Sequence, residues 1–560
     1  MHGSSPTVLK PVLFFSSIQP TRWVLPTILV AFVLLGALGI TNMGVVGEVA
    51  WGWMSADPSA HHAAPPPTHT WGPLEAATTR PMSSLVIAGA SWPLAINVYT
   101  GGWADWPARA LSPFGFEATR WLFLLGGALF IGLVHRFLRI HATLSAARIA
   151  SLLLATDWTF VFFRRALGGT ELMLHAATLL CLWSLWSRRW AGGRHGLTAF
   201  ALGVGIGLSA KLTFVLTLAP LLITAWLMRW DKPRLNPPLP ARWSPIAWAL
   251  LIPMTPSLIA WAHLSLADLP ILASHDHLSP QIDRLTATLT GGPRPGRESL
   301  AALLAWIGDG SSFLGAAWGA EEQPWFSPMR MLGWAVVLFG SFIAWRERDP
   351  TPRLALTRFC TVFVVLQVLF TWGVARDLHH LAIAGPTLMI LAGLSIDAWA
   401  AQFGARISLK RGLVAILCCA PWVVQGVHSI LKTDALLDSI QRPTVAMSGQ
   451  LAIVELLERT SAERVLTMDY EAAGSLDVLA PEVRFAHSWT RVLSDREGAL
   501  QGVLTQASGG HLLVFPYAPA WTYNLKPREA DLERAAEQAG VAMEVVGRLP
   551  DDAAVLYAVD

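Results

Sequence analysis

Two carboxylates follow the first apolar segment of the chain. Glu48 and Asp57 lie in GVVGEVAWGWMSAD, just after residues 23–42. A carboxylate held in a cleft that excludes water can accept the proton of a hydroxyl group, so both residues are candidate general bases. A solvated loop acid is the alternative for each. We favour Glu48, because Asp57 precedes Pro58 and a His-, Ala- and Pro-rich stretch that gives its side chain less support.

Cations and histidines stand at the ends of later apolar segments. They are Arg164 and Arg165 in FFRRALGGTE, Lys211 in GLSAKLTF, and His379 and His380 in ARDLHHL. Such cations can extend to lipid headgroups, and the histidines can face solvent. Their common placement instead favours a binding site for a phosphate group. An adjacent His pair without a third ligand is weak support for a metal, so we expect no metal and no cofactor.

These residues need a frame of membrane helices to bring them together. Hydrophobic residues make up 53% of the chain and charged residues only 14%, against about 25% charged residues in a soluble domain. A helix that crosses a bilayer needs roughly 17–25 residues. Eleven segments meet this requirement: 23–42, 119–137, 143–163, 169–187, 194–210, 212–228, 244–265, 328–345, 354–375, 380–400 and 412–431. The predicted fold is therefore mostly α, a polytopic membrane helical bundle.

The distribution of basic residues predicts the orientation of the bundle. With the N-terminus in the cytoplasm, the cytoplasmic loops are rich in Arg and Lys residues. The short outer turns contain only Arg164, Arg165, Lys211 and Arg376. This asymmetry follows the positive-inside rule. A net charge of +3 gives no indication of nucleic-acid binding, and the Arg-, Ala- and Trp-rich composition favours a bacterial inner membrane.

The chain divides into a membrane domain over residues 1–435 and an extracytoplasmic domain over 436–560. In the first, residues 43–118 form a long outer loop, predicted as irregular chain with interfacial helices near the apolar residues 84–98. In the second, alternating helix and strand patterns predict a small α/β domain with a partly parallel sheet. All four cysteines fall inside apolar spans, so no disulfide is expected.

The order of several motifs resembles the GT-C superfamily of integral membrane glycosyltransferases, in particular the protein mannosyltransferases and aminoarabinose transferases (glycosyltransferase family 39). The early loop reads WPLAINVYTGGWADWPARALSPFGFEATRWLFLLGG, with a Pro-Leu segment, a Tyr-x-Gly turn and an Arg that opens the second span. DWTFVFFRRALGGTELML, GVGIGLSAKLTFVLTLAP and RDLHHLAIAGP then follow in the family's order. The resemblance covers roughly residues 23–430.

The resemblance implies a donor sugar on a polyprenyl phosphate, which reaches the site from the bilayer. Its phosphate would lie among Arg164 or Arg165, Lys211, His379 and His380. Glu48 or Asp57 would accept the proton of a lipid, glycan or protein acceptor, with inversion at the anomeric carbon. The family usually has an Asp-Glu pair after the first span, whereas this chain has Gly47-Glu48. Membrane lipids are the other expected partners, and nucleic acid is not expected.

Two other classes of function remain open at this point. A flippase or other transporter of lipid-linked sugars would also bind phosphate, but it would show charged residues in the middle of its spans. Few are present here; Asp157 is the clearest, and it lies late in its span near the outer side. No internal repeat is evident, which weakly disfavours transporters built from repeated halves. A non-catalytic GT-C-like protein is the third reading, suggested by Gly47. A common cavity for Glu48 or Asp57, Lys211 and the His pair would favour the transferase.

Overall fold

The computed structural model describes the membrane region and the C-terminal domain with gaps between them. The described residues are 23–38, 40, 86–87, 90–91, 116–166, 169–191, 196–210, 214–228, 243–266, 328–348, 350–374, 383–406, 411–437, 446–467, 476, 479–480, 482–487, 496–516 and 529–560.

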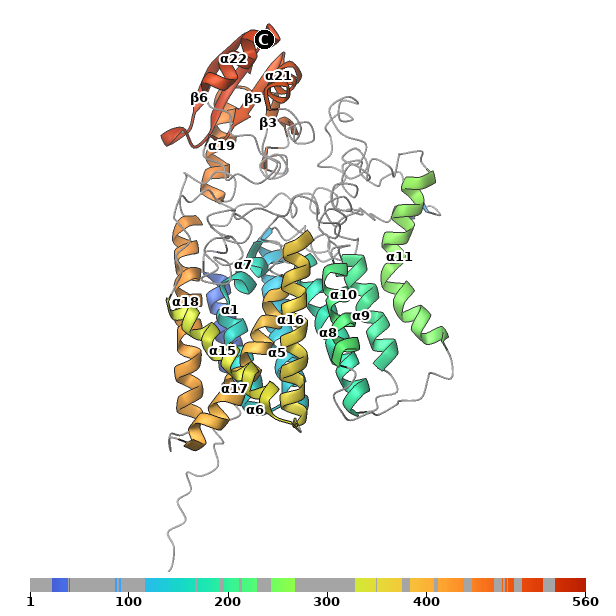
Figure 1. Ribbon diagram of the computed structural model, residues 1–560. Helices are drawn as coiled ribbons and strands as arrows, with labels where there is room; N and C mark the ends of the chain where they lie inside the picture. The colour runs from blue at the N-terminus through green and yellow to red at the C-terminus, as the bar shows by residue number, and fades with distance from the viewer. Residues whose placement is uncertain are drawn as a thin grey trace, which may run out of the picture.

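A bundle of helices forms the membrane region (Figure 1). Its members are α1 (Val24–Ala37), α5 (Phe116–His141), α6 (Leu144–Thr156), α7 (Trp158–Ala166), α8 (Gly169–Ala191), α9 (Gly196–Ala210), α10 (Val215–Leu227), α11 (Ser244–Leu266), α15 (Pro328–Arg346), α16 (Pro352–Val374), α17 (Gly385–Arg406) and α18 (Arg411–Leu437). The described parts of the predicted spans are helical, although 143–163 is divided between two helices. Apolar segments fold this way because lipid offers no hydrogen bonds, so every backbone group must be paired within the segment.

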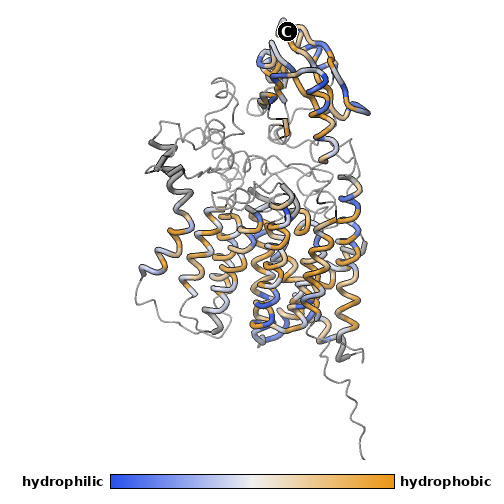
Figure 2. Tube along the Cα trace, turned by 180° about the vertical axis from the view of Figure 1, so that it is seen from behind, coloured by the Kyte–Doolittle hydropathy of each residue, from blue (hydrophilic) through white to orange (hydrophobic). Residues whose placement is uncertain are grey.

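The length and hydropathy of these helices identify an integral membrane protein. Within the described ranges, three segments are individually long and apolar enough to cross a bilayer: Arg120–His141, Pro352–Thr371 and Gly412–Ala435. The other apolar helices are shorter. Figure 2 shows hydrophobic residues along most of the bundle, and many of its large apolar side chains are exposed, as lipid contact requires. The number of membrane-spanning helices, eleven, remains a prediction.

The predicted span 143–163 is wrong as a single helix, because the chain breaks at Asp157 into α6 and α7. Asp157 has an extended backbone conformation, with φ −69° and ψ 117°. Its Oδ1 accepts a hydrogen bond from the backbone N–H of Phe160 at 2.8 Å. This bond caps the first turn of α7, where backbone N–H groups lack partners within the helix. The break turns α7 into a short separate element that carries Arg164 and Arg165.

Helix α17 is the central element of the bundle. Its residues 383–398 are almost continuously buried, and it packs against α6, α15, α16 and α18. The approach of α15 is close: a Cβ atom at Gly340 would lie 2.2 Å from the backbone oxygen of Ser395. Small residues permit such contacts between membrane helices, whose association depends on packing and not on the hydrophobic effect.

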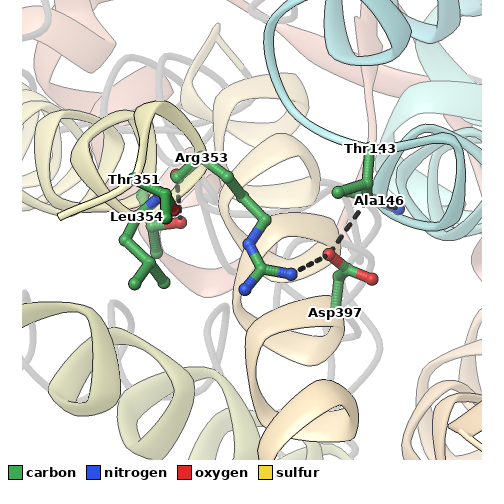
Figure 3. A network of polar contacts seen from close by, with 7 residues as sticks. Thr143, Ala146, Thr351, Arg353, Leu354 and Asp397 are labelled. Carbon is green, nitrogen blue, oxygen red and sulfur yellow. Dashed lines mark hydrogen bonds and ion pairs between the residues drawn. The ribbon is translucent and has the colours of Figure 1, made fainter.

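A polar network joins three helices at the end of the bundle farthest from the C-terminal domain, here termed the lower end (Figures 1 and 3). The carboxylate of Asp397 is fully buried and accepts hydrogen bonds from Thr143 Oγ1 at 2.9 Å and Arg353 Nη1 at 3.0 Å. Thr143 also accepts the backbone N–H of Ala146 at 3.0 Å, which caps α6. The network therefore ties the start of α6, the start of α16 and the last turns of α17 together.

The C-terminal domain contains a five-stranded sheet in the order β4 (Arg484–His487), β3 (Arg464–Thr467), β5 (Gly510–Val514), β7 (Val555–Val559) and β6 (Met543–Arg548). The first three strands are parallel and the last two are antiparallel to their neighbours. Helix α19 (Met447–Arg459) packs on one face, and α21 (Arg496–Ala507) and α22 (Glu529–Ala539) pack on the other. The predicted partly parallel sheet is confirmed.

Two local features of the structure were not predicted from the sequence. Strand β4 and helix α21 have no counterpart in the sequence-based expectation. In the long loop, the described residues are β1 (Val86–Ile87) and β2 (Ala90–Ser91), which pair as antiparallel strands; the rest of the loop, where interfacial helices were predicted, lies outside the described residues up to Phe116. Val and Ile are β-branched and pack well in strands.

Candidate functional site

The structure describes only part of the predicted site directly. Arg164 is described in full, and Arg165 lies in α7 with its side chain outside the described set. The other predicted site residues lie outside the described residues: Glu48, Asp57, Lys211, His379 and His380. The site is therefore built from Arg164 and from the helix ends that flank the remaining positions.

Arg164 is completely buried between helices. Its exposed fraction is 0%, and its Nη2 lies 3.4 Å from Nδ1 of His175 in α8. The guanidinium carbon lies 5.2 Å from the centroid of the Phe160 ring, a cation–π arrangement. Extension to a lipid headgroup is therefore excluded for Arg164.

An acidic residue offsets the buried charge of Arg164. Glu171, in the first turn of α8, is 4% exposed and attracts the guanidinium electrostatically. The N-terminal end of a helix also stabilises a carboxylate, because its partial charge is positive. A buried cation without an opposite charge would be strongly unfavourable. The pair explains how an arginine can remain inside the bundle.

Aromatic rings pack around Phe160 and His175, the two residues that contact Arg164. Phe160 lies 5.7 Å from Phe32 of α1 and 5.6 Å from Phe130 of α5, measured between ring centroids. The His175 ring lies 5.8 Å from Phe160 and 5.9 Å from Phe130. Four helices, α1, α5, α7 and α8, therefore converge on Arg164. The low dielectric of this environment strengthens the electrostatic interactions of the guanidinium.

A hydrogen bond joins the two helices whose ends flank Lys211 and the His pair. Gln367 Nε2 in α16 donates to Thr217 Oγ1 in α10 at 2.9 Å, and both side chains are buried. Helix α10 begins shortly after Lys211, and α16 ends shortly before His379. Lys211 and the His pair are therefore the neighbours in sequence of two helices that lie side by side. The helix ends concerned are at the end of the bundle nearest the C-terminal domain, here termed the upper end (Figure 1).

Helix α1 ends at the same upper end. Three residues beyond its last residue, Ala37, the backbone oxygen of Ile40 accepts a hydrogen bond from Nη1 of Arg120, near the start of α5, at 2.7 Å. Glu48 follows eight positions after Ile40. The described helices nearest in sequence to Glu48, Lys211 and the His pair thus each have one end at the upper end of the bundle, as does α7, which contains Arg165.

Sequence reasoning missed three contributors to this region. His175 and Gln367 lie inside apolar spans, where single polar residues gave no positional signal. Arg120 was visible as the arginine that opens the second span, although its partner, a backbone carbonyl, has no sequence signature. A buried polar side chain in a membrane span needs a partner. This rule indicates that His175 and Gln367 have partners, but it does not identify them.

The comparison with solved structures agrees with the arrangement of the helices and the C-terminal domain. ArnT from Cupriavidus metallidurans, crystallised with undecaprenyl phosphate, matches with a TM-score of 0.56 at 13% identity, over 97% of this chain and 98% of ArnT. The chain therefore shares the fold of ArnT. At this identity the likeness concerns the fold alone, and it agrees with the fold that the resemblance implied.

Other comparisons add less. AglB, an oligosaccharyltransferase from Archaeoglobus fulgidus in complex with an inhibitory peptide and a dolichol-phosphate, matches with a TM-score of 0.47 at 12% identity, over 93% of this chain and 72% of AglB. No family model matches the sequence, and no curated protein matches it significantly.

Proposed function

We propose that this protein is a membrane glycosyltransferase that moves a sugar from a polyprenyl-phosphate donor to an acceptor at the upper end of the bundle. The observation that carries the proposal is that the Arg164 cluster and the ends of α1, α10 and α16 lie at the same end of the bundle. The buried Arg164 cluster, the adjacent helices α10 and α16, and the end of α1 support the proposal, because these described elements are the neighbours in sequence of the predicted basic segments and of Glu48. ArnT, which has the same fold, was crystallised with undecaprenyl phosphate.

The reaction is a direct displacement at the anomeric carbon. The acceptor oxygen forms a bond to this carbon, the bond to the phosphate oxygen breaks, and the electron pair leaves with the polyprenyl phosphate. The acceptor's proton passes to Glu48, or to Asp57 as the alternative base. The configuration at the anomeric carbon inverts.

Cations stabilise the negative charge that develops on the departing phosphate, usually the largest catalytic contribution in such sites. We assign direct phosphate contacts to Lys211, Arg165, His379 and His380. Arg164 is enclosed by protein and its charge is offset by Glu171, so we assign it no direct contact with the phosphate. No metal and no cofactor enter this scheme, because the leaving group is a monophosphate whose charge these residues can balance.

The location follows from the same orientation. We assign the upper end and the C-terminal domain to the extracytoplasmic side of a bacterial inner membrane, with the N-terminus in the cytoplasm. The positive-inside distribution supports this assignment. Asp157, the clearest of the few charged residues within the predicted spans, caps α7, which gives it a structural role.

A transfer assay tests the proposal. Purified protein is incubated with a panel of labelled polyprenyl-phosphate sugars and with lipid, glycan and peptide acceptors. Release of free polyprenyl phosphate together with a labelled acceptor is the expected result, and it should be lost in Glu48→Gln. Translocation of a donor in vesicles without any bond cleavage would instead establish a transporter.

A further inference from the structure

Helix α7 is not continuous with the helix before it. It has nine residues, and the extended conformation of Asp157 separates it from α6. A helix that is not a continuation of its predecessor can rotate about its own axis without disturbing that predecessor. The rotation of α7 must therefore be set by contacts between its side chains and the neighbouring helices.

Two opposite faces of α7 make different contacts. Phe160 and Arg164 are four residues apart and share the face that packs against α1, α5 and α8. Trp158 and Phe162 are also four residues apart, and their rings stack with centroids 5.4 Å apart. The two pairs lie about 160° apart around the helix. All four side chains are buried, so α7 is enclosed on both faces.

Helix α18 provides the contact on the second face. Trp158 Nε1 donates a hydrogen bond to Thr433 Oγ1 in α18, and both side chains are 1% exposed. The Thr433 hydroxyl itself donates to the backbone oxygen of Ser429 at 2.7 Å. A hydroxyl can donate once and still accept, so the indole N–H has the acceptor that a buried tryptophan requires. This bond joins α7 to α18.

The same face of α18 also contacts the end of α6. A Cβ atom at Gly426 would lie 1.9 Å from the backbone oxygen of Thr156, the last residue of α6. Thr433 follows Gly426 by seven residues, or about two turns, so the two positions share a face. Helix α18 therefore contacts the chain on both sides of the break at Asp157. It is also the last helix of the bundle before the C-terminal domain (Figure 1).

We propose that Trp158 is a positioning residue, whose hydrogen bond to Thr433 sets the rotation of α7 and thereby holds Arg164 against His175. A helix rotates as a unit, so release of the indole face displaces the opposite face as well. Trp158 makes no contact with the substrate in this proposal. Arg165 lies on the same helix, and the effect on donor binding rests on the phosphate contact proposed for it above.

A fluorine probe on the opposite face of α7 tests this role without depending on activity. Para-fluorophenylalanine is incorporated at Phe160 of the full-length protein, where the native ring lies 5.2 Å from the guanidinium carbon of Arg164. A second protein carries the probe at Phe359, buried in α16, as a reference. Thr433→Val removes the acceptor with little change of shape. It should shift or broaden the fluorine resonance of the Phe160 probe and leave that of the Phe359 probe unchanged.

Three further variants separate the hydrogen bond from other effects. Thr433→Ser keeps the hydroxyl and should give the resonance of the unmutated protein. Thr224→Val is the matched control and should leave it unchanged, because the Thr224 hydroxyl donates within its own helix, to the backbone oxygen of Pro220 at 2.8 Å. Trp158→Phe removes the donor and keeps an aromatic ring. Combined with Thr433→Val, it should change the resonance no more than either variant alone.

Donor titration on unlabelled protein completes the test. Thr433→Val should weaken donor binding about 10-fold, as expected for partial loss of a charge-assisted hydrogen bond, and Thr433→Ser should restore it. If Trp158→Phe does not fold, Thr433→Val alone decides. An unchanged resonance of the Phe160 probe in Thr433→Val overturns the positioning role, as does an equal change at the Phe359 probe. A change confined to the Phe160 probe, in a protein that transfers no sugar even when unmutated, retains that role and rejects the proposed function.

Discussion

Arg164 shows how a residue type can be recognised while its environment is not. The sequence placed it at the end of an apolar segment, where it could bind a phosphate or extend to lipid. The structure instead buries it with Glu171, His175 and Phe160. Those partners lie on another helix or one turn away, and only the packing of α7 against α8 brings them together. Long-range pairing of this kind has no local pattern in the sequence.

Lys211 is the residue to which we assign direct phosphate contact from the turn before α10. We expect Lys211→Ala to weaken donor binding about 10- to 100-fold, since a charge-assisted hydrogen bond is worth roughly 1.5–3 kcal/mol. Titration with a polyprenyl-phosphate sugar measures the effect. Arg139→Ala removes an exposed cation at the lower end and serves as the matched control. Equal donor affinity in both variants would reduce Lys211 to an interfacial anchor.

Glu48 and Asp57 can be separated by isosteric substitutions. Glu48→Gln preserves the shape of the side chain and removes the proton acceptor, so we expect turnover to fall roughly 10²–10⁴-fold with donor binding intact. Asp57→Asn should have a much smaller effect. Steady-state kinetics and donor titration on the same preparations provide the measurement. Loss of turnover in Asp57→Asn alone would transfer the role of base to Asp57.

At the scale of the elements, periodicity and length predicted the helices well and their interruptions poorly. The described parts of the predicted spans are helical because apolar runs in lipid have one favourable backbone conformation. The break at Asp157 depends on one side-chain cap. In the C-terminal domain, β4 is only Arg484–His487, flanked by residues without a strand pattern. It joins the sheet because β3 offers a parallel edge.

The ion pair between Arg353 and Asp397 should control stability and not chemistry. Asp397→Ala leaves a largely buried guanidinium and the hydroxyl of Thr143 without this acceptor, so we expect destabilisation of about 3 kcal/mol. The double variant Arg353→Met/Asp397→Leu replaces the pair by apolar side chains and should be close to neutral. Thermal unfolding in detergent compares the variants. Full stability in the single variant would contradict the assignment.

Tyr557 on β7 provides a pH-dependent test of the C-terminal domain. Burial raises the pKa of its hydroxyl above the ordinary value of 10.0, with a further increase from Glu529. The folded state therefore favours the neutral phenol. Its contribution to stability is complete below pH 10.0 and declines as the pH rises through the raised value. Unfolding of the full-length protein should show a steeper alkaline loss of stability than that of Tyr557→Phe. Parallel curves for the two proteins would show that the hydroxyl is not linked to folding.

At the scale of the whole molecule, composition and order were enough to indicate a GT-C fold, because the motifs occur in the right sequence even though each is weak. The geometry of the site could not be predicted, since it depends on which helices are neighbours. The pairing of α10 with α16, for example, involves Thr217 and Gln367, which are 150 positions apart.

Topology gives the most direct test at this scale. A reporter that is active only in the cytoplasm, fused after Asp560, should be silent, because we place the C-terminal domain outside. The same reporter fused before Met1 should be active. Signal from the C-terminal fusion would invert the orientation and remove the upper end as a site for extracytoplasmic transfer.

The two ends of the bundle are held by hydrogen bonds of different strength. At the lower end, a buried carboxylate with two donors joins α6, α16 and α17. At the upper end, α10 and α16 share the neutral hydrogen bond between Gln367 and Thr217, worth about 1 kcal/mol net. Helix α16 takes part in both contacts, and a charge-assisted hydrogen bond is roughly twice as strong as a neutral one. We therefore expect α16 to be held more firmly at its start, near Arg353, than at the level of Gln367.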